Sequence, residues 1–427
     1  MFDSKKPSLY IDVSHTWNSN LQTGMQKVVR ELCAAWDSEN FECQLVIFQN
    51  GQYKILPRNA LKEILIVSLS QDSKTLFRDR LRKTARLIYF KIRSKIPLCI
   101  RLSFQTSNPA RKIRSYLNST PTLENYETLN INGINLLILE IVFDPDQIEY
   151  IFNLISSKQT SVTFFSYDLI PINYKEFCTP EFIHLFKRYL EISRYSQKLW
   201  SISNHTKNEL EQFVGNSENL IHSTYKWLPP SVYVKCDHNL PFQNSEKKKY
   251  LLFVSSFEPR KNHLGFFLAL QLLKKEKITI PTVVFVGGSA WNDGPINKNM
   301  ENLILEGFDL IKLNNIKECC VGNLYKHALL TLYPSHMEGF GLPVVESLSF
   351  GVPVLTSDIG STAELLKLPG TIGFIPTDPK DLAAKLKLFL TNQSTQQTLT
   401  EGAKSAKDLL GNWSDYANDL YLFATKE

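Results

Sequence analysis

Residues 333–364 have the sequence YPSHMEGFGLPVVESLSFGVPVLTSDIGSTAE, and this stretch decides the fold class. It follows a short apolar run that is typical of a buried strand, and it passes through a loop that contains Gly339 and Gly341. A helix is expected next, because Pro343 is well tolerated in a first turn. Glycines at such a bend let the backbone approach a ligand, and the free N–H groups at a helix start favour an anion. The pattern therefore predicts a strand, loop and helix unit that binds a phosphate group.

Short apolar strands alternate with helices on both sides of residues 221–249, a stretch with three prolines and little periodicity. Alternation of this kind predicts parallel sheets with helices on both faces. We expect an α/β chain of two doubly wound, Rossmann-like domains, residues 1–235 and 236–410, facing across a cleft that holds the ligand. The expected strands are Leu9–Val13, Cys43–Phe48, Ile134–Ile141, Ser161–Phe165, Ser196–Ser203, Tyr250–Val254, Thr282–Val286, Ala328–Tyr333 and Val352–Thr356.

The composition of the 427 residues excludes a disordered or fibrous chain, since 43% are hydrophobic and 21% are charged. The net charge is +6, but residues 74–114 hold thirteen basic residues and a single acidic one, Asp79. Apolar residues recur at helical spacing over 77–96. This basic insertion therefore either lies on an anionic membrane surface or forms an ordinary surface helix with solvated charges. The rest of the chain is mildly acidic, which argues against binding of nucleic acid.

Two further features of the chain predict a cytoplasmic protein, with peripheral contact to the inner face of the cytoplasmic membrane left open. The first residues lack the apolar core of a signal peptide, and no run approaches the roughly 18 apolar residues of a membrane-spanning helix. The seven cysteines form no Cys-x-x-Cys pair, so reduced thiols are expected.

Charged side chains accompany the glycine loop. Glu338 precedes it, and Glu346 is expected in the first turn of the helix. A carboxylate beside a phosphate would be repelled, so both are predicted to accept hydrogen bonds from hydroxyl groups of the same ligand. Arg260 and Lys261 follow the strand Tyr250–Val254 and could clamp a diphosphate. A diphosphate next to hydroxyl-bearing sugars is a nucleotide-sugar, although Glu346 alone could be only a residue favoured by the helix dipole.

Together these motifs resemble the donor-binding half of glycosyltransferase family 4, retaining enzymes of the GT-B fold. The resemblance implies that Glu338 contacts the transferred sugar and Glu346 the nucleotide ribose, while Arg260 and Lys261 bind the diphosphate. It further implies donor contacts from the loop residues Gly339, Phe340, Gly341 and Leu342. Residues 358–364 (DIGSTAE) resemble the loop that follows in the family, which is a weaker signal.

The N-terminal half resembles mannosyl- and rhamnosyltransferases of bacterial surface polysaccharide synthesis. In IDVSHTWNSNLQTGMQKVVREL the resemblance places Gly24 beside the donor phosphates, and in FFSYDLIPINY it places Asp168 where many members carry a sugar-contacting histidine. It implies transfer of a hexose, with GDP-mannose favoured and UDP- or dTDP-sugars open, to a saccharide or lipid-linked saccharide. It also implies that residues 411–427 form a helix that packs back on the first domain.

No metal cofactor is expected, because Arg260, Lys261 and the helix start would supply the positive charge. The triplet Asp144-Pro-Asp146 imitates a metal-binding pair, but we interpret it as the end of a strand. Two other functions are kept: a nucleotide-sugar epimerase, and a catalytically silent GT-B scaffold of a polysaccharide assembly complex.

Overall fold

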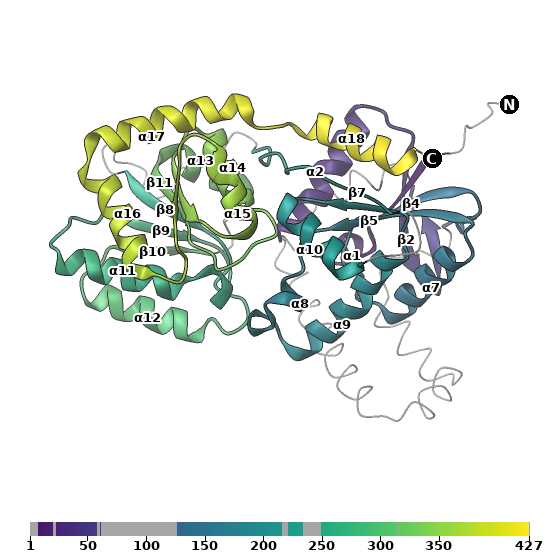
Figure 1. The fold of residues 1–427 in the computed structure, drawn as a ribbon, viewed down its shortest axis with the longest axis horizontal. Coiled ribbons are helices and arrows are strands. Elements are labelled where there is room, and N and C mark those ends of the chain that lie inside the picture. The colour runs from purple at the N-terminus through teal and green to yellow at the C-terminus, as the bar shows by residue number, and fades with distance from the viewer. Residues whose placement is uncertain are drawn as a thin grey trace.

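The computed structural model describes residues 7–19, 23–57, 60, 126–215, 221–233, 249–314 and 316–426. Two α/β domains lie side by side, each built around its own sheet (Figure 1). The two doubly wound domains expected from the sequence are therefore confirmed. The basic insertion at 74–114, with the amphipathic helix expected in it, lies outside the described residues.

The first domain holds a seven-stranded sheet in the order β3-β2-β1-β4-β5-β6-β7. All neighbours are parallel except β2 and β3, which pair antiparallel at one edge. The chain reverses its winding between β1 and β4, which is where α/β sheets bind ligands. The strands are β1 (Leu9–Asp12), β2 (Cys43–Gln49), β3 (Gln52–Ile55), β4 (Ile134–Ile138), β5 (Thr160–Ser166), β6 (Lys198–Ser201) and β7 (His222–Tyr225).

Alternate residues of these strands enter two separate cores. Leu9 and Ile11 of β1 pack with α2, whereas Tyr10 faces the opposite side with α7 and α9. The helices of this domain are α1 (Ser14–Asn18), α2 (Gly24–Ser38), α7 (Pro145–Ser156), α8 (Ile170–Asn173), α9 (Pro180–Leu190) and α10 (Asn204–Val214), with 3-10 turns η1 (Lys175–Phe177) and η2 (Glu191–Arg194).

The second domain holds a parallel six-stranded sheet in the order β10-β9-β8-β11-β12-β13, with its winding reversed between β8 and β11. Helices α11, α12 and α16 bury one face, and α13, α14 and α17 lie on the other. The strands are β8 (Tyr250–Val254), β9 (Val283–Val286), β10 (Leu310–Leu313), β11 (Ala328–Tyr333), β12 (Val354–Ser357) and β13 (Thr371–Phe374). The helices are α11 (His263–Lys275), α12 (Gly294–Leu305), α13 (Glu318–His327), α14 (Leu342–Ser349), α15 (Gly360–Glu364), α16 (Pro379–Thr391) and α17 (Gln393–Ala406), with turns η3 (Pro259–Lys261), η4 (Leu365–Lys367) and η5 (Lys407–Leu409).

The last helix, α18 (Trp413–Thr425), crosses from the second domain to the first and packs against α2 (Figure 1). Two indole groups of the first domain hold it: the Trp36 Nε1 donates to the carbonyl of Ala417 at 3.1 Å, and the Trp200 Nε1 donates to the Tyr416 hydroxyl at 2.7 Å. One apolar core therefore runs through α2, α18, α14 and α17, and it joins both domains.

Four strands were not expected from the sequence: β3, β7, β10 and β13. All four lie at sheet edges, where only part of each side-chain row is buried, so no continuous apolar run marks them. One of them, β7, falls inside residues 221–249, the proline-containing stretch with little periodicity in which no strand was expected. Asp144 is also placed differently, because it caps the start of α7 by accepting from the Asp146 N–H at 2.9 Å. No helix in the described part of the chain is long and apolar enough to cross a membrane.

Candidate active site

Arg260 and Lys261 lie at the carboxyl edge of the second sheet. The chain leaves β8 at Val254 and forms the turn η3, which ends at Asn262 in the left-handed conformation (φ 59°). The Asn262 side chain accepts from the Gly265 N–H and caps α11. This tight reversal directs both cations toward the loop that follows β11.

Glu338 lies between these two cations. Its Oε2 accepts from Arg260 Nη1 at 2.6 Å and its Oε1 accepts from Lys261 Nζ at 2.6 Å. Arg260 also donates to the Met337 carbonyl and to Glu258, at 2.9 and 2.8 Å. Glu338 and Lys261 are each 8% exposed, so the cluster is largely shielded from water. The sequence predicted that these three residues lie at one sheet edge, and the structure brings them together there; it did not predict that they pair with one another.

The electrostatics of this cluster keep Glu338 ionised. Burial alone would raise the pKa of Glu338, but the charges of Arg260 and Lys261 lower it to about 2. Asp168 of the first domain lies close enough for its charge to interact with Arg260 and Glu338. Burial raises the pKa of Asp168, although Arg260 opposes this shift. Residues from both domains thus share one electrostatic environment.

Gly339 brings the two domains into backbone contact. A Cβ atom at this position would lie 2.0 Å from the Tyr167 carbonyl oxygen, so only glycine fits. The Gly339 carbonyl accepts from the Ser203 hydroxyl at 2.8 Å and from the Thr206 hydroxyl at 3.1 Å. The close approach predicted for this glycine is therefore an approach to the first domain.

The carbonyl groups of this loop are satisfied, but its N–H groups are not. The Ser361 hydroxyl donates to the carbonyls of Glu338 and Phe340, at 2.7 and 3.2 Å. For the N–H groups of Gly339, Phe340 and Gly341, the described residues supply no hydrogen-bond acceptor. These groups precede α14, whose N-cap Gly341 has φ 124° and whose first turn carries no acidic residue. The arrangement suits an anion or a sugar hydroxyl.

One of the predicted loop contacts would have to come from the backbone. The Phe340 side chain is 3% exposed and belongs to the apolar core, so the predicted role of Phe340 rests on its main-chain groups. The Leu342 side chain packs against the same core but is only partly buried.

Glu346 is also buried, at 3% exposure, and it lies one turn further into α14 than expected. Its Oε1 accepts from Lys27 Nζ at 2.9 Å and from the Ser231 hydroxyl at 2.6 Å, while its Oε2 accepts from the Tyr325 hydroxyl at 2.9 Å. Burial would raise the pKa of Glu346, but Lys27 and the hydroxyl donors lower it. Three hydrogen bonds, rather than the helix dipole, stabilise this carboxylate.

Lys27 is a residue that the sequence analysis missed. It lies one turn after Gly24 on α2, and besides Glu346 it contacts Glu318 at 3.0 Å and the Tyr233 hydroxyl at 2.9 Å. Among the described residues, nothing lies within 4 Å of a Cβ added to Gly24, the first residue of α2. The signal that could have indicated Lys27 is its position one helical turn after Gly24, which places the two residues on the same side of α2.

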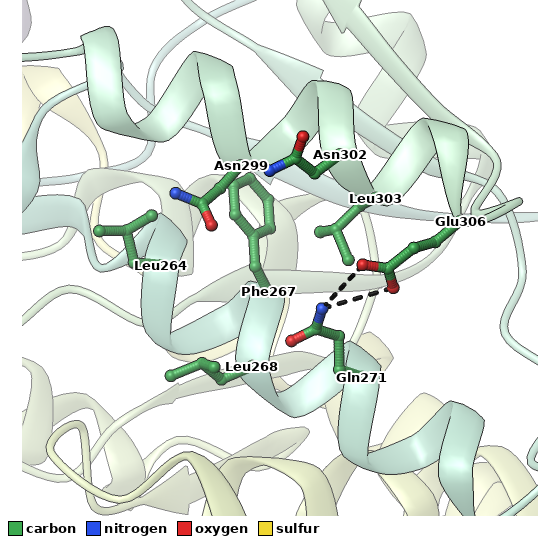
Figure 2. Close-up of a pocket in the computed structure, with 8 residues that line it drawn as sticks. All are labelled: Leu264, Phe267, Leu268, Gln271, Asn299, Asn302, Leu303 and Glu306. Carbon is green, nitrogen blue, oxygen red and sulfur yellow. Dashed lines mark hydrogen bonds between the residues drawn. The ribbon is translucent and has the colours of Figure 1, made fainter.

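The described part of the chain also has a hollow of about 270 Å³ between α11 and α12, which holds none of the residues above. Figure 2 shows leucines beside polar groups there, with the Gln271 amide donating to Glu306 at 3.2 and 3.4 Å. It is lined by Leu264, Phe267, Leu268, Gln271, Asn299, Asn302, Leu303 and Glu306.

Comparison with known proteins identifies the class of the second domain. Residues 238–406 match the family described as glycosyl transferases group 1. The chain is 32% identical over 159 residues to the O-antigen chain mannosyltransferase B of Escherichia coli, covering 37% of this chain and 41% of that protein. It is 25% identical over 177 residues to the O-antigen chain mannosyltransferase RfbU of Salmonella typhimurium, covering 40% and 48%. The chain thus spans less than half the length of either relative.

The fold is that of GT-B glycosyltransferases. Sucrose-phosphate synthase from Thermosynechococcus elongatus superimposes with a TM-score of 0.63 over 98% of this chain and 99% of its own, at 16% identity. At that identity the likeness concerns the fold alone. The protein therefore has a GT-B fold, and residues 238–406 in its second half are similar to the glycosyl transferases group 1 family.

Proposed function

We propose that this protein is a retaining glycosyltransferase that moves a hexose from a nucleoside-diphosphate sugar to a saccharide or lipid-linked saccharide in bacterial surface polysaccharide synthesis. The observation that carries the proposal is the buried Glu338 held between Arg260 and Lys261, next to Asp168 of the other domain. An ionised carboxylate can accept from sugar hydroxyls, and two adjacent cations can stabilise a leaving diphosphate.

In this proposal, a protein group is available to bind each part of the nucleotide-sugar donor. The N–H groups of Gly339, Phe340 and Gly341 point to a ligand that supplies acceptors, as a phosphate or a sugar oxygen does. Glu346 has a carboxylate suited to ribose hydroxyls, and it would exchange its bonds to Ser231 or Tyr325 for bonds to the ribose. Gly24 at the open start of α2 leaves room for the phosphates.

The proposed chemistry is attack from the front face. The acceptor oxygen bonds to the anomeric carbon on the side from which the phosphate oxygen leaves, and the acceptor proton passes to that phosphate oxygen. Configuration is then kept without a carboxylate nucleophile. Arg260 and Lys261 would stabilise the charge that develops on the diphosphate, while Glu338 and Asp168 would position the sugar.

The donor and the acceptor are inferred from the relatives. Two relatives carry the words O-antigen chain mannosyltransferase in their names, which favours GDP-mannose as the donor and a growing surface saccharide as the acceptor. We place the reaction in the cytoplasm, where nucleotide-sugars would be available, and assign the contact to an anionic membrane surface to the basic insertion 74–114. No metal is assigned a role.

Donor binding and turnover test the proposal. The purified protein would be titrated with GDP-, UDP- and dTDP-sugars without added metal, beside the variants Glu338→Ala and Lys261→Ala and the surface control Glu401→Ala. Saturable binding and slow nucleotide release with one donor, lost in the two site variants and kept in the control, would support it. Absence of binding to every donor would favour the silent scaffold instead.

The stereochemistry needs its own measurement. With an acceptor in hand, the anomeric configuration of the first product would be read by NMR before it can equilibrate. The same configuration as the donor supports retention. An inverted product would contradict the front-face mechanism while leaving sugar transfer intact.

A further inference from the structure

We propose that Glu364 is a positioning residue that holds the two domains closed over the active site. The proposal rests on the proposed function for its link to turnover, but the contact itself is visible in the fold. Glu364 ends α15 of the second domain, and α15 lies against α10 of the first domain. The sequence marked this glutamate only as part of a weak resemblance.

The Glu364 carboxylate accepts three N–H groups, and all three come from the other domain. Its Oε1 accepts from the His205 backbone N–H at 2.6 Å, and its Oε2 accepts from the Asn204 backbone N–H at 3.2 Å. The Trp227 Nε1 completes the set by donating to Oε2 at 2.8 Å. A single side chain of the second domain thus accepts hydrogen bonds from a helix and from a loop of the first domain.

Asn204 and His205 are the first residues of α10, so their N–H groups have no partner inside the helix. Within the described part of the chain, the side chain of the N-cap residue Ser203 accepts from the Thr206 N–H, at 3.1 Å, and leaves the two earlier N–H groups to Glu364. Glu364 therefore completes the cap that Ser203 begins, because it accepts the two N–H groups that Ser203 does not bind. Its charge also complements the positive end of the helix dipole.

The contact lies beside the donor loop on both sides. On the second domain, Ser361 of α15 holds the carbonyls of Glu338 and Phe340. On the first domain, Ser203 and Thr206 at the start of α10 hold the carbonyl of Gly339 between them. The pair α10 and α15 therefore brackets residues 338–340. By holding the start of α10, Glu364 keeps Ser203 and Thr206 in place to bind the Gly339 carbonyl.

Gly360 permits this close approach. It has φ 53°, and a Cβ atom there would lie 3.2 Å from the His205 Nε2 and 2.8 Å from the Met337 sulfur. The first residue of α15 is thus fitted against the first turn of α10. This close contact is a second, independent observation that the first turns of α15 and α10 fit together when the two domains are closed.

The test uses the full chain with Glu364→Ala, Glu364→Gln and Trp227→Phe, and with Glu401→Ala as a matched surface carboxylate of the same domain. Hydrogen exchange of the first α10 turn and the radius of gyration in solution report the contact without any turnover. We expect exchange at least tenfold faster in Glu364→Ala, since a hydrogen bond to a charged group contributes about 1.5–3 kcal/mol. A larger radius of gyration should accompany it. Glu364→Gln and Trp227→Phe should lie between this variant and the control.

Kinetics then separate positioning from binding. The dissociation constant of the nucleotide alone should stay within about threefold, because the second domain binds it, while kcat with the donor falls at least tenfold. If Glu364→Ala has the same hydrogen exchange and the same radius of gyration as Glu401→Ala, the proposed contact is wrong. If exchange in Glu364→Ala is faster but kcat is unchanged, the contact exists but does not position the active site. Failure of the proposed function differs from both, because the unaltered protein itself would then show no turnover.

Discussion

The Lys27 ammonium group lies 2.9 Å from the Glu346 carboxylate, although 319 positions of the chain separate the two residues. Lys27 belongs to α2 of the first domain and Glu346 to α14 of the second. Both side chains are largely buried, with 17% and 4% of their surfaces exposed. The carboxylate proposed to bind the ribose is therefore also a contact between the domains.

Lys27→Met tests this pair. The variant would leave Glu346 buried without its cation, and breaking a buried ion pair in this way typically costs about 3–5 kcal/mol of unfolding free energy. Urea unfolding at pH 7 measures the loss. Lys387→Met is the control, because Lys387 pairs with Glu276 on the surface and should contribute less than about 1 kcal/mol. Equal effects of the two substitutions would contradict the importance of the buried pair.

The pH dependence of stability tests the charge state of Glu338. Its pKa is about 2 in the folded protein and near 4.5 when unfolded, so the unfolded chain binds more protons between these values. Stability from this group is then complete above about pH 4.5 and is lost as the pH falls toward 2, a change on the order of 3 kcal/mol.

The difference between the unaltered protein and Glu338→Gln isolates this effect, since other titrating groups are common to both. Urea unfolding from pH 7 down to pH 3 should show the difference shrinking as the pH falls. A difference that is constant across this range would mean that Glu338 is not held ionised by Arg260 and Lys261.

Gly339→Ala tests the backbone contact between the domains. The added methyl group would lie 2.0 Å from the Tyr167 carbonyl oxygen and 3.0 Å from the Asp168 Cβ, so the domains must move apart. We expect a larger radius of gyration in solution and at least a tenfold loss of donor turnover. Gly411→Ala is the matched control, because nothing lies within 4 Å of its added methyl group. Equal radii of gyration for Gly339→Ala and Gly411→Ala would contradict this expectation.

Lys198→Met tests how the final helix is anchored. Lys198 is 6% exposed, and its Nζ donates to the Ala424 carbonyl at 3.0 Å and to the Lys426 carbonyl, at the end of α18. Its loss should cost about 1–3 kcal/mol and speed amide exchange in α18. Exchange measured by mass spectrometry on the C-terminal peptide, with Lys387→Met as reference, decides the point. Unchanged exchange there would show that the two indole contacts suffice.

Particular elements show how far the sequence could predict this fold. Strands β8 and β11 begin and end where their apolar runs do, because strands buried in a parallel sheet have continuous apolar sequences. The edge strands β7 and β13 were missed, since half-exposed strands lack such runs. Asp144 shows the same limit on a smaller scale, because its sequence context does not distinguish a strand end from a helix cap.

In the candidate site, too, some features could be predicted from the sequence and others could not. Glycine at 339 predicted a close backbone approach to a ligand, and the structure adds a close approach to the Tyr167 backbone of the other domain. The sequence also predicted that Glu338, Arg260 and Lys261 lie at the same edge of the second sheet. Their hydrogen bonds to one another could not be predicted from their spacing. No sequence pattern distinguishes Lys27 or Glu364, because the partner that makes each of them important lies in the other domain.

Local sequence patterns are enough to predict the two sheets, the glycine loop before α14, and the placement of Glu338, Arg260 and Lys261 at one edge of the second sheet. These features follow from local rules: strand and helix periodicity, helix-start chemistry and the common direction of parallel strands. The tertiary structure alone decided that Lys27 meets Glu346, that Gly339 touches Tyr167 and that Glu364 caps α10. The physical reason is that such contacts join residues far apart in the chain, and only the packing of the two domains brings them within hydrogen-bonding distance.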